Sequence, residues 1–435
     1  MRLFLSWLMA FPCLISLIMT IAHGQTSQSQ SSIPQSSQKF GVWSPKEFPI
    51  SFWCGPPDAF TTLERYQEIK EAGFTHVLPA CGAARIPELN RKILDLCRQV
   101  GLKAFISDAR MPLAITGVAD AKTRLDAIAQ DYKNQPALEG YHLTDEPGAG
   151  AFPGLAEVVA YLREKDPQHH AYINLFPNYA PASALGTPTY EEHVRRYLEQ
   201  VKPFVLSYDH YHFTASGDGP LFFPNLATAR KLAAEFNVHF WQIVLLVQHG
   251  HYRSPTEGEL RYEAMQTLAY GGSGLLWFTY WQPDDPSFVW TSAMINLNGT
   301  RNPHYEMARR INGELKAFGG QLLNATSTAV FHVGRMPPGG TGPGADAPLR
   351  VAGKGSFTIG LFRDAAGKTL ALITNADYRQ PILTDFIVST GRSRLQQFNP
   401  HTGRWNYVAG AKSQPDHDIM VSLSLSSGGA VLLRW

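Results

Sequence analysis

The chain has 435 residues, of which 44% are hydrophobic and 17% are charged, and its formal net charge is +2. This length is enough for one large domain and a small one. The basic residues form no concentrated stripe, so we expect no nucleic-acid partner.

The first 24 residues have the pattern of a secretion signal. Arg2 precedes a long apolar run that ends in Ala22-His23-Gly24, a small-x-small sequence typical of signal-peptide cleavage. An uncleaved anchor is the alternative, since the run is long enough to span a bilayer. We predict a signal peptide over residues 1–24, a disordered linker over 25–47, and a secreted or periplasmic protein without membrane contact beyond export.

Export makes disulfides feasible. The mature chain keeps Cys54, Cys81 and Cys97. Cys54 and Cys81 end two consecutive predicted strands, so a bridge between them is conceivable. We expect instead three buried thiols.

From residue 48, short apolar runs alternate with segments of helical period. Eight such units predict a (β/α)8 TIM barrel over residues 48–320. A doubly wound open sheet usually has fewer strands and a Gly-rich first turn, which this chain lacks. The predicted strands are 50–54, 75–80, 103–108, 139–144, 170–176, 204–211, 239–247 and 274–281, and the predicted helices are 63–73, 86–101, 121–133, 154–166, 189–201, 225–237, 258–272 and 302–320.

The pattern changes after Gly320. Segments such as 327–334, 356–364 and 369–377 are short and alternate between apolar and polar residues. This alternation, with turns between the segments, predicts a small C-terminal antiparallel β-sandwich over residues 321–435.

Polar and aromatic residues gather where the predicted barrel strands end, which is where barrel enzymes carry their chemistry. Acids, amides, imidazoles and flat aromatic rings suit a sugar, because rings stack on its C–H face and polar groups bond its hydroxyls. The residues expected to contact such a substrate are Trp53, Asp108, His142, Asp145, Asn174, Asn178, Tyr208, His210, Gln248, His249, Trp277, Tyr280 and Trp281.

Structural roles are the alternative for several of these residues. Trp277 and Trp281 could simply pack the barrel mouth. Asp108 could pair with Arg110, and Asn174 could cap a loop, as could Asn178. Asp145 points opposite to Glu146 if regular strand geometry persists.

The sequence Thr144-Asp145-Glu146-Pro147 after the fourth strand resembles the retaining-glycosidase superfamily called clan A. Its members usually carry Asn-Glu there, and that Glu is the general acid/base. The stretch 265–282, MQTLAYGGSGLLWFTYWQ, resembles the β-galactosidase-like branch, where the residue matching Trp281 lines the sugar subsite. The resemblance covers residues 48–319 and implies a glycoside hydrolase with Glu146 as its acid/base.

One departure concerns the second carboxylate. Clan A places a nucleophilic Glu at the end of strand seven, where this chain reads LLVQHGHYRSP without an acid. Glu257 follows later, and Glu259 fits a capping box with Thr256. Asp209, near the end of strand six, is therefore the predicted partner of Glu146, with Asp108 and Asp145 in reserve. Side chains from strands four and six could reach a retaining distance of about 5 Å or an inverting one of about 6.5–9.5 Å.

Three functions remain open at this point. The first is hydrolysis of an oligosaccharide, polysaccharide or glycoside by Glu146 and Asp209, with no cofactor or metal. The second is a metal-dependent hydrolase that uses His210, His212, His249 and His251, since residues two apart on a strand share a face. The third is a carbohydrate-binding barrel that has lost catalysis.

Overall fold

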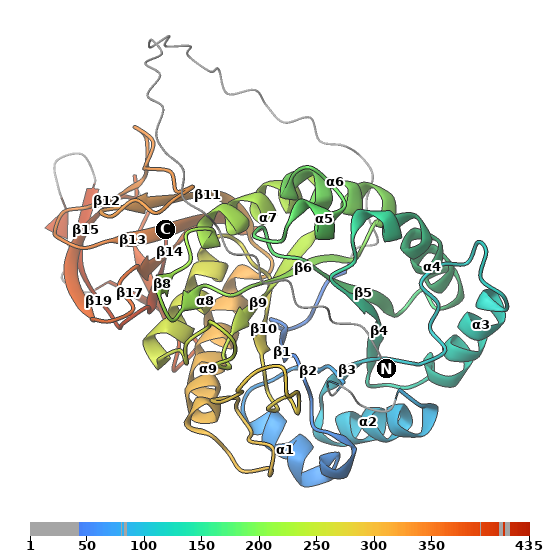
Figure 1. Ribbon diagram of the computed structural model, residues 1–435. Coiled ribbons are helices and arrows are strands. Elements are labelled where there is room, and N and C mark those ends of the chain that lie inside the picture. The colour runs from blue at the N-terminus through green and yellow to red at the C-terminus, as the bar shows by residue number, and fades with distance from the viewer. Residues whose placement is uncertain (1–42, 80, 82–84, 392, 409–411, 414–417) are drawn as a thin grey trace, which may run out of the picture. The chain divides into compact units, whose positions relative to one another are not determined.

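Figure 1 shows the computed structural model, which describes residues 43–79, 81, 85–391, 393–408, 412–413 and 418–435. These residues belong to one compact unit. The predicted signal peptide, and the predicted linker up to residue 42, lie outside the described residues. Within the described ranges, no helix is both long enough and apolar enough to cross a bilayer.

The first part of the described chain forms a parallel sheet of eight strands in the order β1-β10-β9-β6-β5-β4-β3-β2. The end strands β1 and β2 are neighbours too, because the Thr75 N–H donates to the Ile50 carbonyl at 2.9 Å. The sheet is thus nearly closed, consistent with the predicted TIM barrel. The strands are β1 (Ile50–Phe52), β2 (His76–Val77), β3 (Lys103–Ile106), β4 (Leu138–Asp145), β5 (His170–Leu175), β6 (Val205–His210), β9 (His239–Leu245) and β10 (Gly274–Phe278).

Within the described residues, a long helix follows each barrel strand at its predicted position. Side chains of Thr62 and Thr189 cap two of them, and Thr256 with Glu259 forms the predicted capping box. The helices are α1 (Leu63–Glu71), α2 (Pro87–Val100), α3 (Ala121–Tyr132), α4 (Phe152–Lys165), α6 (Tyr190–Val201), α7 (Phe222–Phe236), α8 (Glu257–Ala269) and α9 (Pro303–Leu322), with short turns η1 (Asp58–Phe60), η2 (Ala149–Ala151) and α5 (Ala182–Leu185).

Aromatic side chains fill the barrel interior. Phe105, Tyr172 and Trp241 project inward from three strands and pack with Trp43 and Phe204. Alternate strand residues face the surrounding helices, because side chains change sides along a strand. The packed interior leaves the strand ends as the place for a ligand.

Two antiparallel sheets follow the barrel and share one apolar core that includes Phe331, Phe357, Phe386 and Leu423. A small hairpin, β7 (Phe213–Thr214) and β8 (Gly217–Asp218), is inserted after β6. The larger sheet contains β11 (Thr326–Val333), β13 (Phe357–Arg363), β14 (Thr369–Asn375), β20 (Ala430–Arg434), β16 (Gln396–Asn399) and β17 (Arg404–Tyr407). The smaller contains β12 (Leu349–Val351), β15 (Ile382–Ser389), β19 (Asp418–Leu425) and β18 (Lys412–Ser413).

Helix α8 joins the barrel to the larger antiparallel sheet and is buried along almost its whole length. Gln266 Nε2 donates to Thr374 Oγ1 on β14 at 3.0 Å. Gly360 on β13 approaches the Ala269 carbonyl so closely that a Cβ there would overlap it. A polar, buried helix of this kind has no free face, which explains why its sequence shows only weak amphipathic character.

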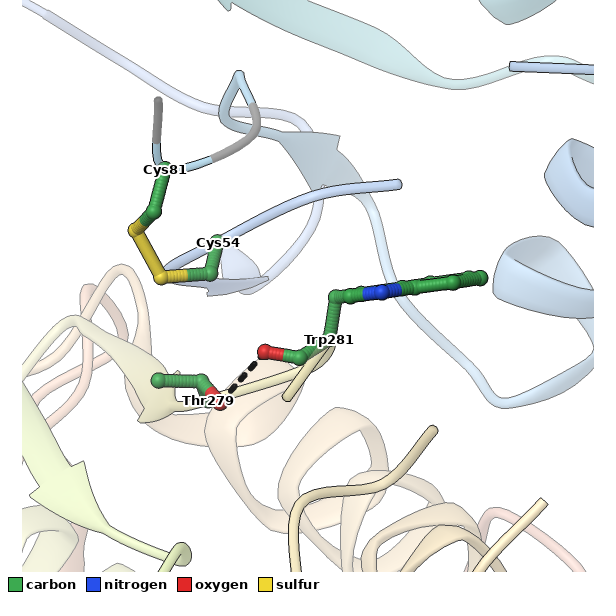
Figure 2. Close-up of a disulfide and its surroundings, with 4 residues drawn as sticks. All are labelled: Cys54, Cys81, Thr279 and Trp281. Carbon is green, nitrogen blue, oxygen red and sulfur yellow. Dashed lines mark hydrogen bonds between the residues drawn. A yellow bond between two sulfur atoms is a disulfide. The ribbon is translucent and has the colours of Figure 1, made fainter. Parts of the chain in front are cut away.

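A disulfide joins Cys54 to Cys81 (Figure 2), which corrects the expectation of three buried thiols. Their Cα atoms lie 4.6 Å apart, within the range a disulfide requires, and only the fold brings them that close. Among the described residues, Cys97 on α2 is the remaining cysteine, and it is a buried free thiol. In Figure 2 the bridge lies beside the chain that follows β10, where Thr279 Oγ1 donates to the Trp281 carbonyl at 2.8 Å.

The disulfide ties the ends of β1 and β2, the pair that closes the sheet. Because its cysteines are 27 residues apart, the double variant Cys54→Ser/Cys81→Ser should lose about 3.5 kcal/mol of unfolding free energy through loop entropy. Urea denaturation of the oxidised protein and the variant measures this loss. Reduced wild-type protein is the control and should match the variant; equal stability of all three would contradict the prediction.

Candidate active site

A bulge in β4 decides the direction of its last residues. The pairing of β4 with β5 shifts between His142 and Thr144, so Leu143 is an extra residue in the ladder. After the shift, Asp145 pairs with Asn174. An extra residue reverses the alternation of sides, so Asp145 faces the barrel mouth on the same side as His142.

Glu146 turns toward the same site as Asp145, against the alternation expected of a regular strand. Its φ is +47°, a left-handed conformation that is uncommon for a residue with a side chain. Its N–H still donates to the Asn174 carbonyl at 2.9 Å, and Pro147 follows. The two neighbouring acids therefore act on one site instead of pointing apart.

The amide of Asn174 connects the ends of β4 and β6. Its Nδ2 donates to Asp145 Oδ1 at 3.1 Å and to Asp209 Oδ1 at 3.0 Å. Its Oδ1 accepts a hydrogen bond from Ser207 Oγ at 3.1 Å. When two oxygen atoms each accept one of the two hydrogens of an amide nitrogen, these oxygens lie about 5 Å apart. Asn174 therefore sets the distance between the Oδ1 atoms of Asp145 and Asp209.

Burial raises the pKa of all three carboxyl groups, and charge repulsion adds to this effect at Glu146 and Asp209. Burial, with the neighbouring Asp145 charge, raises the pKa of Glu146 to about 7. Asp145 keeps an exposed edge, but the protein around the rest of its side chain displaces water and raises its pKa to about 6. Asp209 is buried, and its pKa lies well above the usual range because of burial and the charge of Glu146.

Glu146 and Asp209 also share a hydrogen bond. Two carboxylates have only acceptors, so one member of this pair must carry a proton. The cluster thus contains a proton donor and at least one group able to ionise near neutral pH.

Three tyrosines that the sequence did not identify as site residues lie beside the carboxyls. Burial raises the pKa of the Tyr211 phenol, and the nearby charges of Asp209 and Glu146 raise it further. The Tyr211 N–H donates to the Tyr179 oxygen at 3.3 Å, and Tyr252 donates to the same oxygen at 3.4 Å. Tyr179 and Tyr211 follow predicted strands, a detectable pattern, whereas Tyr252 lies in a loop.

Aromatic rings flank the site. The Trp53 ring meets the edge of His142 with 5.3 Å between centroids, and burial lowers the pKa of His142 to about 4, so this imidazole is neutral. His142 Nε2 is buried without a hydrogen-bond partner in the described part of the chain. The Phe278 ring stacks on the Tyr211 ring with 5.1 Å between centroids. The Trp290 ring stacks on the His249 ring with 4.7 Å between centroids.

The predicted sugar-binding indoles are not at the mouth, which is a correction. Trp277 is 0% exposed, and its Nε1 donates to Asn312 on α9 at 2.8 Å. Trp281 is 4% exposed and packs on Phe60. Trp277 faces the helix layer, because alternate positions of a barrel strand point outward. Trp281 lies beyond the end of β10, and its ring also lies under the Arg65 guanidinium of α1 at 5.2 Å.

Two predicted tyrosine contacts, Tyr208 and Tyr280, also correspond to buried packing residues; Tyr280 stacks on Phe52 at 4.6 Å, and Tyr208 faces Phe240.

The remaining predicted contacts have local partners. Asp108 is buried in an ion pair with Arg110 at 2.8 Å, the structural alternative. Asn178 donates from Nδ2 to the Leu221 carbonyl at 3.0 Å, as a loop cap. The exposed Gln248 accepts a hydrogen bond from Thr291 at 2.8 Å.

The four histidines of the metal hypothesis do not meet. His210 Nδ1 bonds Asn225 Oδ1 at 3.1 Å, and His249 Nδ1 bonds the Val247 carbonyl at 3.2 Å. Across the described ranges, no three His, Cys, Asp or Glu side chains are grouped as metal ligands.

Comparison with known proteins finds a likeness in fold. No family model and no curated protein matches the chain. The β-galactosidase of Bacillus circulans sp. alkalophilus has a TM-score of 0.62 at 10% identity, over 89% of this chain and 99% of that one. A catalytic mutant of a GH42 β-galactosidase from G. stearothermophilus has a TM-score of 0.60 at 7% identity, over 91% and 100%.

The β-galactosidase of the psychrophilic Marinomonas ef1 is matched at 12% identity with a TM-score of 0.48, over 64% of this chain and 62% of that one. The chain thus spans less than two thirds of that protein. At these identities the likeness shows the fold alone.

The raised pKa of Glu146 predicts how stability depends on pH. In the unfolded chain a Glu titrates near 4.3, and in the folded protein near 7, so the folded state holds the extra proton between these values. The contribution of Glu146 to stability is therefore fully present below about pH 4 and is lost as the pH rises to about 7. Glu146→Gln, which keeps a hydrogen bond to Asp209, should therefore raise the unfolding free energy by about 1–2 kcal/mol at pH 8 and change it little at pH 4.

Denaturation at both pH values measures this difference. The control is Glu157→Gln, since Glu157 is a half-buried acid that accepts hydrogen bonds from Thr116 and has a lowered pKa. It should show no gain at pH 8. A Glu146→Gln protein that is less stable than wild type at pH 8 would contradict the prediction.

Proposed function

We propose that this protein is a secreted glycoside hydrolase that cleaves an O-glycosidic bond with the carboxyl cluster of Asp145, Glu146 and Asp209. The cluster carries the proposal, because glycosidases need one protonated and one ionised carboxyl at the reacting bond. The glycoside-hydrolase neighbours support it at the level of fold. The fold that we propose is a TIM barrel over residues 48–320 followed by a β-sandwich over 321–435.

In this proposal Glu146 is the general acid/base. With a pKa of about 7, it holds its proton at neutral pH and still releases it readily, which suits a group that must do both. It protonates the glycosidic oxygen as the bond breaks. If Asp209 attacks the sugar, a glycosyl–Asp209 ester forms as the leaving group departs with the proton of Glu146, and Glu146 then deprotonates the water that displaces Asp209. If Asp209 instead activates the water, Asp209 takes that proton and Glu146 acts only as the acid.

The second carboxylate in the proposal is Asp209, with Asp145 as its rival. Asp209 bonds Glu146, so a substrate must separate the two before Asp209 can attack or activate water. Asp145 lies about 5 Å from Asp209, close to the spacing of a retaining pair, and it ionises more readily than Glu146. Asn174 stabilises the ionised form of either Asp through its amide hydrogens.

The substrate in this proposal is a saccharide or glycoside. Trp53 and Phe278 offer faces for a sugar ring, and His142 Nε2 is a polar atom with a hydrogen bond still to make. Secretion after cleavage at Gly24 is part of the proposal, and the Cys54–Cys81 disulfide supports it, because such bonds persist in oxidising compartments.

Replacing the acid should have a distinctive effect. Glu146→Gln should lower kcat/KM on oligosaccharides by at least about 10³-fold, because the leaving sugar then departs without a proton. Hydrolysis of a dinitrophenyl glycoside should fall much less, since that leaving group needs no proton. Both rates are measured on a panel of sugars, with Glu157→Gln as the unaffected control; full activity of Glu146→Gln on oligosaccharides would remove the proposal.

The rival second carboxylates can be separated by azide rescue. Asp209→Ala should be inactive on both substrate types, and azide should restore the release of dinitrophenol by taking the place of the missing carboxylate. Asp145→Ala should keep measurable activity without azide. If azide instead rescues Asp145→Ala, and Asp209→Ala keeps measurable activity without azide, Asp145 is the second carboxylate and Asp209 is not.

A further inference from the structure

A cavity of about 810 Å³ lies between the barrel and the C-terminal sheets, away from the carboxyl cluster. On the barrel side it is lined by the β7–β8 hairpin and by Phe223 and Tyr262 from α7 and α8. On the other side it is lined by the segments 335–338 and 376–379. Its volume is in the range of cavities that hold small organic ligands.

One short segment separates this cavity from the candidate active site. The Tyr252 ring contacts Tyr211, beside Glu146, with 5.4 Å between centroids. The next residue, Arg253, lines the cavity instead. The two sites therefore share a wall but not their side chains.

Asp218, Glu259 and Asp377 are the acids that line the cavity, and all three accept hydrogen bonds from the protein; Asp377 Oδ1 accepts from the Arg379 N–H at 2.7 Å. Arg253 Nη2 donates to Asp218 Oδ1 at 2.9 Å and to Glu259 Oε1 at 2.6 Å. Tyr378 donates from its hydroxyl to Asp218 Oδ2 at 2.7 Å, which links the hairpin to the C-terminal sheets. These carboxylates hold the walls together, and they have little remaining capacity to bind a ligand.

The unused hydrogen-bonding capacity of the cavity consists mainly of donors. Arg335 and Arg379 form no ion pair with any carboxylate in the part of the chain that the structure describes. Arg379 lies over the Tyr378 ring at 5.1 Å and donates from Nη2 to the Tyr378 hydroxyl at 3.2 Å, which leaves its other N–H groups available. Guanidinium groups of this kind bind a carboxylate through two parallel hydrogen bonds.

A buried imidazole gives the cavity a second polar contact. His212 is 5% exposed, and its Nδ1 has no hydrogen-bond partner at bonding geometry within the described residues. Its ring lies nearly parallel to that of Tyr262, with 6.0 Å between centroids. A ligand hydroxyl would satisfy this nitrogen, while the aromatic walls offer apolar contact to a ring.

We propose that this cavity is a second binding site, for a saccharide that carries a carboxylate, with Arg335 and Arg379 holding the carboxylate and His212 bonding a ring hydroxyl. The choice of a saccharide rests on the proposed function, whereas the choice of a carboxylate rests on the two unpaired guanidinium groups. The site binds a sugar acid without cleaving it, and a polymer held here would stay close to the carboxyl cluster.

Calorimetric titration with trigalacturonate tests the site, using the Glu146→Gln protein so that no hydrolysis interferes. We expect binding by this protein, and at least about tenfold weaker binding when Arg335→Ala and Arg379→Ala are added, since two charge-assisted pairs are lost. The matched control is Arg404→Ala, which removes an exposed arginine of β17 that does not line the cavity. It should bind as the parent does.

Two further probes separate charge from sugar recognition. A neutral galactose trisaccharide and inorganic sulfate should each bind at least about tenfold more weakly than trigalacturonate, because each offers only one of the two recognised features. Equal binding of the neutral trisaccharide, equal binding of sulfate, no binding of trigalacturonate, or equal binding after loss of both arginines would each overturn the proposal.

The outcomes also distinguish this inference from the proposed function. If the protein binds trigalacturonate but hydrolyses no glycoside, the proposed second site stands and the proposed hydrolase activity is wrong. If hydrolysis depends on Glu146 but trigalacturonate does not bind to the cavity, the hydrolase activity stands and the second site is wrong. Loss of trigalacturonate binding on replacing Glu146 would place the sugar acid at the carboxyl cluster and overturn the second site.

Discussion

Three carboxyl groups that lie close together and are largely surrounded by protein do not all ionise readily, and the proposed chemistry of this protein depends on that constraint. Asp145, Glu146 and Asp209 meet at the ends of β4 and β6, where burial raises all three pKa values and charge repulsion raises those of Glu146 and Asp209 further. Asn174 opposes the repulsion, because its single amide donates to two of the three groups. The balance leaves protons on the cluster at neutral pH, and a group that keeps its proton there can act as an acid.

The geometry that brings the carboxyls together is irregular. A regular β4 would send Asp145 to one face and Glu146 to the other. The bulge at Leu143 and the left-handed turn at Glu146 remove this alternation. Such departures cost conformational energy, and they persist only where the surrounding structure holds them in place. Here the holding contacts are the pairing with β5 and the hydrogen bond from Glu146 to the Asn174 carbonyl.

The C-terminal sheets are part of the same structural system as the barrel. Helix α8 contacts both, with Gln266 bonded to Thr374 and Glu263 buried with a strongly raised pKa, so that its carboxyl is neutral. The hairpin after β6 reaches the same sheets through Asp218 and Tyr378. Since this hairpin begins only a few residues beyond Asp209, a ligand in the neighbouring cavity lies within a short segment of the carboxyl cluster.

The amino-acid sequence alone determined the repeating units, because apolar periodicity is a local property of strands and helices. It placed all eight barrel strands and their helices within a few residues, the capping box at Thr256, and the acids at the strand ends. It did not determine which side chains face the mouth, since that depends on strand register and one inserted residue. Trp277 and Trp281 were therefore assigned to the wrong face, and the convergence of Asp145 with Glu146 was missed. The Cys54–Cys81 pairing, the bridge made by Asn174 and the tyrosines beside the acids depend on distances between remote segments, and only the tertiary structure decides those distances.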